Sequence, residues 1–255
     1  MADIQVERDG RVLVATMGRG KANALNSALV EELHAVLQAA RDDAAIGALV
    51  IASANTRLFC AGLDVGEVFA YDEGTMRRFF DRFVSLLDAL RVLPKAVVAA
   101  VSGHAYAGGA LIALASDFRV MGEGEFGFAL NEVDLGLVLP AEATRWIAPS
   151  LGAATRDVLL GGMAIGPRHA LQVGLASDLV PASAVRDRAI SLARTLADKP
   201  PIAFAAIKQG IVEALGGLPD AQGRQAFVDE FMRYWTGPES TARRQALIAS
   251  MTRQP

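Results

Sequence analysis

The sequence predicts an α/β fold that ends in a helical region. Up to about residue 140, short β-rich runs alternate with segments whose apolar residues recur at helical spacing, a pattern typical of βαβ units. Beyond residue 140, helical segments follow one another and are separated by glycine and proline pairs. We therefore expect a core over residues 1–195 and a helical region over residues 196–255, which packs on the core or on a neighbouring subunit.

The first part contains four strand-like runs and two helical patterns. Residues 12–17 (VLVATM) predict the first strand, and the apolar positions between residues 29 and 40 predict a helix that Asn26 or Ser27 caps. Residues 47–52 (GALVIA) predict the second strand, and residues 75–90 predict an amphipathic helix. Residues 96–101 (AVVAAV) predict the third strand, and residues 118–121 (FRVM) are a candidate fourth.

The second part is expected to be helical throughout. The helical segments are residues 154–160, 168–173, 182–197, 202–215 and a stretch from residue 221 onward. Between the third and fourth strands, residues 96–115 carry no formal charge if His104 is neutral, and their length matches a membrane span. The polar and small residues SGHAYAGG interrupt the middle of this window, so we expect a strand, a loop and a helix there.

Composition and charge narrow the class of protein. A net charge of -3 and a pI near 5.7 give no overall attraction to nucleic acid or to an anionic membrane, although a local basic patch for a phosphorylated ligand stays open. Cys60 is the only cysteine, which favours a reducing, cytoplasmic compartment and a small buried hydrophobe at this position. Charges near the amino terminus argue against a signal peptide.

Several catalytic motifs are absent from the sequence. It has no G-x-x-x-x-G-K-[ST] phosphate loop and no G-x-S-x-G nucleophile elbow. Its three histidines show no paired spacing, so no metal site is expected. Carboxylates and backbone amides remain as the groups able to carry chemistry.

Two glycine-bearing turns follow apolar stretches: CAGLD at residues 60–64 and AYAGGAL at residues 105–111. If the strands before them are neighbours, the turns can direct two backbone N–H groups at one point, as in an oxyanion hole. The second turn also opens a helix, whose N-terminal dipole favours developing negative charge. Ordinary tight packing between strand and helix is the alternative explanation.

One carboxylate, Glu132, lies within the apolar segment FGFALNEVDLGLVLP. Burial among such residues would raise its pKa, a condition that suits a general base near neutral pH. The alternative is a solvated loop residue.

Taken together, these segments resemble the crotonase, or enoyl-CoA hydratase/isomerase, superfamily. The resemblance rests on KANALN, AGLD, GHAYAGGAL with SDFRV behind it, LNE…LG and ALQVGLASDLVP, and it covers nearly the whole chain. It implies a crotonase-like core of repeated ββα units, assembly as trimers or dimers of trimers, and an acyl-CoA thioester as substrate, with no separate cofactor. By the family pattern, the backbone N–H groups of Leu63 and Gly108 hold the thioester oxygen.

The acids indicate which branch of the family the chain resembles. Hydratases of this family carry two glutamates, and the chain has Leu111 in place of the first and keeps only the second, Glu132. Dienoyl-CoA isomerases place a further acid where this chain has the apolar residues 138–140. The single-glutamate 3,2-enoyl-CoA isomerases fit better, so the resemblance implies that Glu132 moves a proton from C2 to C4. The alternatives are a hydratase that uses Asp64, Glu67 or Glu142, and a non-catalytic acyl-CoA binding module.

The resemblance also implies softer contacts with the substrate. Residues expected to line the CoA path are Lys21, Ala22, Ala24, Ala61, Gly62, Asp64 and Val65. Asn131 is expected beside the acyl group, Lys208 at a CoA phosphate, and Phe79, Phe80 and Phe83 either along the acyl tunnel or in the core.

Overall fold

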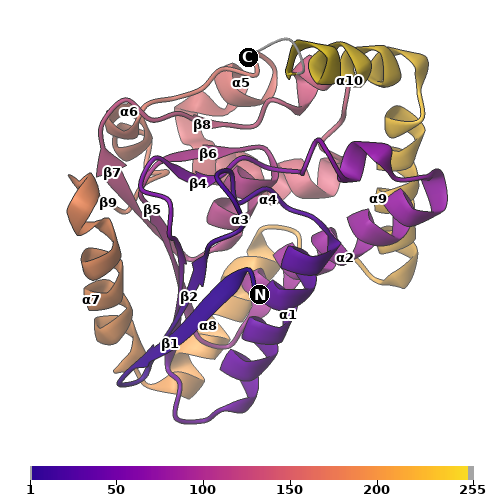
Figure 1. The fold of residues 1–255 in the computed structure, drawn as a ribbon. Helices are drawn as coiled ribbons and strands as arrows, with labels where there is room; N and C mark the ends of the chain where they lie inside the picture. Colours follow the sequence, from indigo (N-terminus) through magenta and orange to yellow (C-terminus); the bar gives the residue numbers. More distant parts are fainter. Residues whose placement is uncertain (1, 252–255) are drawn as a thin grey trace.

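The structure is a computed structural model that describes residues 2–251 (Figure 1). The strands are β1 (Ile4–Asp9), β2 (Val12–Met17), β3 (Ala48–Ser53), β4 (Leu58–Cys60), β5 (Ala96–Val101), β6 (His104–Tyr106), β7 (Phe118–Glu123), β8 (Phe128–Ala129) and β9 (Asp178–Pro181). The α-helices are α1 (Ser27–Asp42), α2 (Glu73–Val92), α3 (Gly108–Ala115), α4 (Ala141–Leu151), α5 (Thr155–Leu159), α6 (Pro167–Gln172), α7 (Val185–Ala197), α8 (Pro201–Ala214), α9 (Ala221–Trp235) and α10 (Pro238–Met251). Short 3₁₀ helices lie at η1 (Val68–Ala70), η2 (Glu132–Leu135), η3 (Gly152–Ala154) and η4 (Ala182–Ala184).

The chain repeats a ββα unit, as the resemblance implied. The units are β1-β2-α1, β3-β4-α2 and β5-β6-α3, and β7-β8 continues through η2 to α4. After the first unit, the two strands of each unit separate into different sheets. The large sheet has the order β1-β2-β3-β5-β7-β9, and the small sheet has the order β4-β6-β8. All strand pairs except β1 with β2 are parallel.

The central strands β2, β3 and β5 of the large sheet are buried on both faces, as is typical of parallel sheets. Helix α7 covers one face and forms a small apolar cluster with β2, β3, β5 and β7 (Figure 1). The other face carries the main core, built with α1, α2, α3 and the small sheet. This second core places the amino-terminal end of α3 against the small sheet.

Local signals in the sequence set the helix ends. The Asn26 side chain accepts a hydrogen bond from the N–H of Leu29 at 2.9 Å, which confirms it as the cap of α1. Helix α2 buries the predicted apolar face, and Asp72 caps its amino-terminal end, where its carboxylate accepts from the N–H of Thr75. The uncharged window at residues 96–115 folds into β5, β6 and α3, as predicted. Among residues 2–251, no helix is both long enough and apolar enough to cross a membrane.

The expectation of helices alone after residue 140 is wrong at β9. Its four residues, DLVP, pair in parallel with β7 at the edge of the large sheet. Strand β1 was also missed, because four of its six residues are exposed and three of the six are charged. The strands of the small sheet are only two or three residues long, too short for a recognisable pattern.

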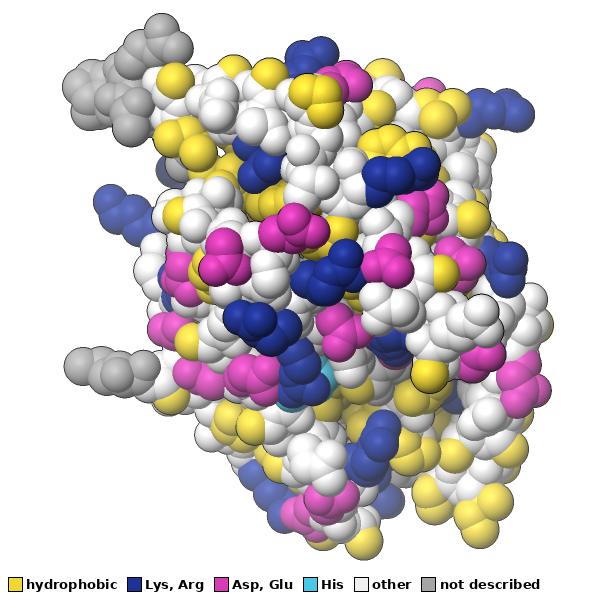
Figure 2. All heavy atoms as spheres, turned by 90° about the vertical axis from the view of Figure 1, so that its right-hand side faces the viewer, with side chains coloured by type: hydrophobic (Ala, Val, Ile, Leu, Met, Phe, Trp, Pro, Cys, Tyr) yellow, Lys and Arg dark blue, Asp and Glu magenta, His cyan; other side chains and the backbone are white. Residues whose placement is uncertain are grey.

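The carboxy-terminal helices pack on the core of the same chain. Phe80 of α2 stacks on Phe231 of α9, with ring centroids 3.5 Å apart. Figure 2 shows the right-hand side of Figure 1, where α2 and α9 lie. Acidic and basic side chains are interspersed on this side. Helix α8 leaves Ile202, Ile207 and Ile211 exposed. The homotrimer or dimer of trimers stays a prediction.

Candidate active site

Three predicted site segments follow the three strands of the small sheet. Strand β4 leads into Ala61–Leu63, β6 into Ala107–Gly108, and β8 into Leu130–Glu132. Because these strands are parallel neighbours, their carboxyl ends meet at one edge of the sheet. The N–H of Ala107 donates to the carbonyl of Ala129 at 2.9 Å, which continues the pairing into the turns.

The glycines allow these turns to approach one another. A Cβ on Gly109 would lie 2.4 Å from the carbonyl oxygen of Cys60, and a Cβ on Gly108 would lie 2.8 Å from Leu25 Cδ1. Gly62 has a φ of +93°, and a Cβ there would lie 2.9 Å from Ala107 Cβ. The glycine pair therefore serves close packing of α3 against β4, the alternative weighed from the sequence, and the same packing sets the position of the Gly108 N–H.

The two proposed oxyanion donors are free. Within the described part of the chain, neither the N–H of Leu63 nor that of Gly108 has a hydrogen-bond acceptor. Gly108 is the first residue of α3, where an N–H has no partner inside the helix. Ala107 before it has a φ of +45° and a ψ of -119°, a strained conformation for a residue with a side chain. Its ψ sets the plane of the peptide that carries the Gly108 N–H.

Glu132 occupies the first position of η2. The residue as a whole is half-buried, but its carboxylate is enclosed: Oε2 is buried and has no hydrogen-bond partner among the described residues. Burial raises the pKa of Glu132 to about 7 and outweighs a hydrogen bond from its own backbone N–H. The side chain is therefore poised to gain or lose a proton near neutral pH.

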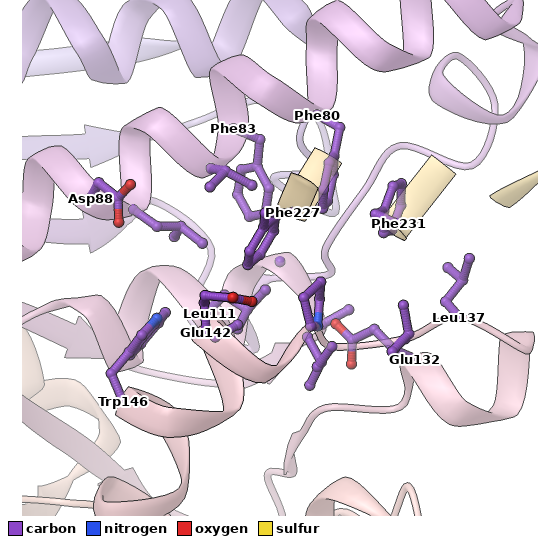
Figure 3. A pocket seen from close by; sticks show the side chains of 18 of the residues that line it. Phe80, Phe83, Asp88, Leu111, Glu132, Leu137, Glu142, Trp146, Phe227 and Phe231 are labelled. Carbon is purple, nitrogen blue, oxygen red and sulfur yellow. The ribbon is translucent and has the colours of Figure 1, made fainter. Parts of the chain in front are cut away.

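A cavity of about 310 Å³ brings the site together. Ala61, Leu63, Val65, Gly108, Asn131 and Glu132 all line it. Phe80 and Phe83 form part of its apolar wall, whereas Phe79 packs edge-on against Tyr71 in the core. In Figure 3, Leu111 and Glu142 lie between Glu132 on one side and Asp88 and Trp146 on the other. Within this view, Glu132 is thus separated from Asp88 and Trp146 by Leu111 and Glu142.

The pKa of Glu132 predicts the pH dependence of activity. A general base works only when ionised, so we expect kcat/KM to rise with pH, to reach half its maximum at about 7 and to level off roughly one unit higher. An unperturbed glutamate would already reach the plateau near pH 5 to 6, roughly one to two units above its usual pKa. The measurement is a kcat/KM profile from about pH 5 to about pH 9. A profile that stays flat from about pH 6 to about pH 8, roughly one unit on either side of the raised pKa, would contradict the assignment.

The loop KANALN lies beside the AGLD turn but outside the cavity. The carbonyl oxygen of Ala22 accepts from the N–H of Ala61 at 3.1 Å, and that of Gly62 accepts from the N–H of Leu25 at 2.8 Å. Five of the predicted CoA-path residues do not line the cavity, and their role stays a prediction: Lys21, Ala22, Ala24, Gly62 and Asp64.

Arg19 is a positioning residue that the sequence did not reveal. Its Nη1 contacts Asp64 Oδ2 at 2.5 Å and the carbonyl oxygen of Ala24 at 2.9 Å, and its Nη2 lies 3.4 Å from Glu67 Oε2. Glu67 also accepts from Asn26 Nδ2 at 2.7 Å. Asp64 and Glu67 therefore hold the turn that carries Leu63. Arginine is common on protein surfaces, so a lone Arg19 in the sequence gave no signal of this role.

The expectation that Lys208 contacts a CoA phosphate is wrong. Lys208 is buried on the inner face of α8, and its Nζ donates to Asp117 Oδ2 at 2.8 Å and to the carbonyl oxygen of Lys95 at 3.1 Å. A buried ammonium needs such partners, and it is not accessible to a phosphate. Cys60 is buried as expected, and burial raises the pKa of its thiol to about 12. No group of His, Cys, Asp or Glu within residues 2–251 is arranged to hold a metal ion.

Sequence comparison agrees with this geometry. The sequence profile described as Enoyl-CoA hydratase/isomerase matches residues 7–246. The chain belongs to the enoyl-CoA hydratase/isomerase family. The match includes all three turns at the edge of the small sheet and the 3₁₀ helix that carries Glu132. Membership of this family agrees with the observed fold, and enzymes of the family act on acyl-CoA substrates.

Relatives within the family carry different activities. The chain is 36% identical to the 2,3-dehydroadipyl-CoA hydratase of Escherichia coli (strain K12), over 89% of both chains. It is 31% identical to the carnitinyl-CoA dehydratase of Proteus mirabilis (strain HI4320), over 89% of this chain and 86% of that one. The crystal structure of human mitochondrial delta3-delta2-enoyl-CoA isomerase superimposes with a TM-score of 0.91 over 98% of both chains, at 23% identity. That likeness shows the fold alone.

Proposed function

We propose that this family member isomerises 3-enoyl-CoA thioesters to 2-enoyl-CoA thioesters with Glu132 as the single base. The observation that carries the proposal is the pair of residues facing the cavity. Glu132 offers a buried carboxylate, and Leu111, where hydratases of the family hold a second glutamate, is apolar and 7% exposed. Adding water needs two groups to handle protons, whereas shifting a double bond needs one.

The proposed reaction is a proton transfer across three carbons. The ionised Glu132 removes a proton from C2, and the electron pair of that C–H bond moves toward the thioester oxygen. The N–H groups of Leu63 and Gly108 stabilise the negative charge on that oxygen. The protonated carboxyl then returns the proton at C4, which leaves the double bond between C2 and C3. A pKa of about 7 suits both steps, since the carboxyl must first accept the proton and then release it.

A direct assay tests the proposal. Purified protein is mixed with 3-enoyl-CoA thioesters of several chain lengths, and formation of the conjugated 2-enoyl thioester is followed by its absorbance. We expect the absorbance to grow with at least one chain length. Tight binding of these thioesters without any turnover would instead identify an acyl-CoA binding module.

Hydration is the second candidate function, and Glu142 is the observation that favours it. Glu142 lies in the first turn of α4 and lines the cavity beside Leu111 (Figure 3). Glu142 is exposed, and its carboxylate makes no hydrogen bond or ion pair with residues 2–251. It offers a second acid from a different element, and the names of the two bacterial relatives are those of a hydratase and a dehydratase.

Replacing Glu142 with glutamine separates the two functions. If Glu132 acts alone, Glu142→Gln should leave isomerisation of 3-enoyl-CoA nearly unchanged. If Glu142 supplies the second acid, the same change should lower hydration of 2-enoyl-CoA by at least about 100-fold, the usual contribution of one acid or base. Parallel rates of both reactions in the wild type and the variant decide between them.

A further inference from the structure

The end of the cavity away from Glu132 is polar. We call it the arginine end and define it by Asp88 and Arg91 of α2, Arg145 and Trp146 of α4, and Gly216 and Gly217 of the α8–α9 loop, all of which line the cavity. Figure 3 shows Asp88 and Trp146 on the opposite side of Leu111 from Glu132. Between the two ends the wall is apolar, with Phe83, Val84 and Leu87 on α2.

The acid at this end is already paired twice. Arg91 is 7% exposed, and its guanidinium lies 3.3 Å from Asp88 Oδ1, 3.2 Å from the carbonyl oxygen of Gly217 and 4.9 Å above the Trp146 ring. Arg224 of α9 forms an ion pair with the other oxygen of Asp88. One buried carboxylate therefore serves two guanidinium groups, and the cluster keeps a net positive charge.

Donor capacity remains unused at the arginine end. Arg145 is an exposed residue at the edge of the cavity and makes no hydrogen bond or ion pair with any residue from 2 to 251. Its side chain lies over Gly216, where an added Cβ would be 2.9 Å from Nη1. Nη1 of Arg224, behind Asp88, is buried and has no acceptor. Of the neighbouring acids, Asp220 caps α9 by accepting from the N–H of Gly223 at 2.8 Å.

The remaining acid near this end is Glu142, which lies toward Leu111 (Figure 3). Glu142 precedes Arg145 by about one helical turn on α4, so Asp88, Asp220 and Glu142 match Arg91, Arg145 and Arg224 in number. A cation would find little there, because the Trp146 face is covered by Arg91 and Asp88 is already paired. Arg145 is the cavity-lining guanidinium that has no acceptor among residues 2–251, and a carboxylate matches a guanidinium in both charge and geometry.

We propose that the arginine end binds a carboxylate at the far end of the acyl chain, so that the preferred substrates are CoA thioesters of dicarboxylic acids. This inference rests on the proposed function, because it assumes an acyl chain in this cavity. A Cβ on Gly108 would lie 3.3 Å from Phe83 Cζ, which places the oxyanion donors at the level of Phe83. Phe83 and Arg91 are separated by roughly two turns, about 12 Å of helix. The acyl chain must span that distance, and a carboxylate at its far end would meet the Arg145 guanidinium.

Binding of unreactive thioesters tests the inference independently of catalysis. The probes are three saturated acyl-CoA thioesters of equal length that end in a carboxylate, a methyl group or a trimethylammonium group, with dissociation constants measured by calorimetry. We expect the wild type to bind the carboxylate-ended thioester at least about tenfold more tightly than the methyl-ended one, as a charged hydrogen bond provides. Equal affinities, or a preference for the trimethylammonium end, would overturn the inference.

Two variants test whether Arg145 causes the preference for the carboxylate-ended thioester. Arg145→Met should remove the preference by weakening binding of the carboxylate-ended thioester alone. Arg168→Met removes the same charge from an exposed position on α6 outside the cavity and should keep the preference. If Arg145→Met weakens all three thioesters equally, or if Arg168→Met has the same effect, the arginine end is not the cause. Because the probes cannot isomerise, this result does not depend on whether 3-enoyl-CoA is turned over.

Discussion

Replacing Glu132 with glutamine should lower kcat for isomerisation by about 100- to 10,000-fold, the range expected when a positioned base is lost. An amide has nearly the shape of the carboxylate but cannot take the C2 proton. Since Oε2 has no hydrogen-bond partner among the described residues, the change breaks no contact there. The melting temperature should therefore not fall. The measurements are steady-state kinetics with a 3-enoyl-CoA substrate and a thermal melt.

Asp134→Asn is the matched control. Asp134 lies two positions later in the same 3₁₀ helix, is exposed and does not line the cavity. This control removes one carboxylate from the same helix and should keep kcat close to that of the wild type. A loss of less than about tenfold in Glu132→Gln would exclude single-base catalysis by Glu132.

Replacing Gly109 with alanine should damage both stability and activity. The new Cβ would lie 2.4 Å from the carbonyl oxygen of Cys60, a backbone atom that cannot rotate away. Overpacking of this kind costs roughly 1–3 kcal/mol of unfolding free energy. The start of α3 must shift, and the Gly108 N–H shifts with it. Because loss of one oxyanion donor costs about 100- to 1000-fold in kcat, activity should fall by up to that amount.

Gly210→Ala serves as the control for this change. Gly210 lies within α8, and a Cβ there would meet no heavy atom within 4 Å. Alanine in a helix interior is more stable than glycine by roughly 0.5–1 kcal/mol, so this variant should be at least as stable as the wild type. Urea unfolding and kcat are measured for both variants. A stable and fully active Gly109→Ala protein would contradict the close packing of α3 on β4.

The sequence predicts much of the fold because the long elements carry strong local patterns. The apolar face of α2 and the cap at Asn26 are properties of neighbouring residues, and both are confirmed. Strands of two or three residues, such as β8, have no such pattern. They exist because neighbouring strands and an apolar core hold them, and single-sequence reasoning does not capture contacts between distant segments.

The same distinction applies to the site. Glu132 and the glycine turns are contained in short motifs, and the structure brings them to one cavity. Lys208 was misplaced because its partner Asp117 is 91 residues away and gives no local signal. The roles of Arg19 and Arg145 likewise depend on contacts with distant loops. Motifs therefore indicate the proposed base and oxyanion donors, whereas the contacts of Arg19 and Arg145 require the three-dimensional structure.

The most direct test of single-base isomerisation is the product distribution of the wild-type protein. A 3-enoyl-CoA and the 2-enoyl-CoA of the same chain length are each incubated with the protein. The products are then separated, and their masses are measured by mass spectrometry. Isomerisation leaves the mass unchanged, whereas hydration adds one water. We predict that both incubations reach the same mixture of the two enoyl thioesters and contain no 3-hydroxyacyl-CoA. A 3-hydroxyacyl-CoA formed from the 2-enoyl thioester as fast as the isomer forms would contradict the account.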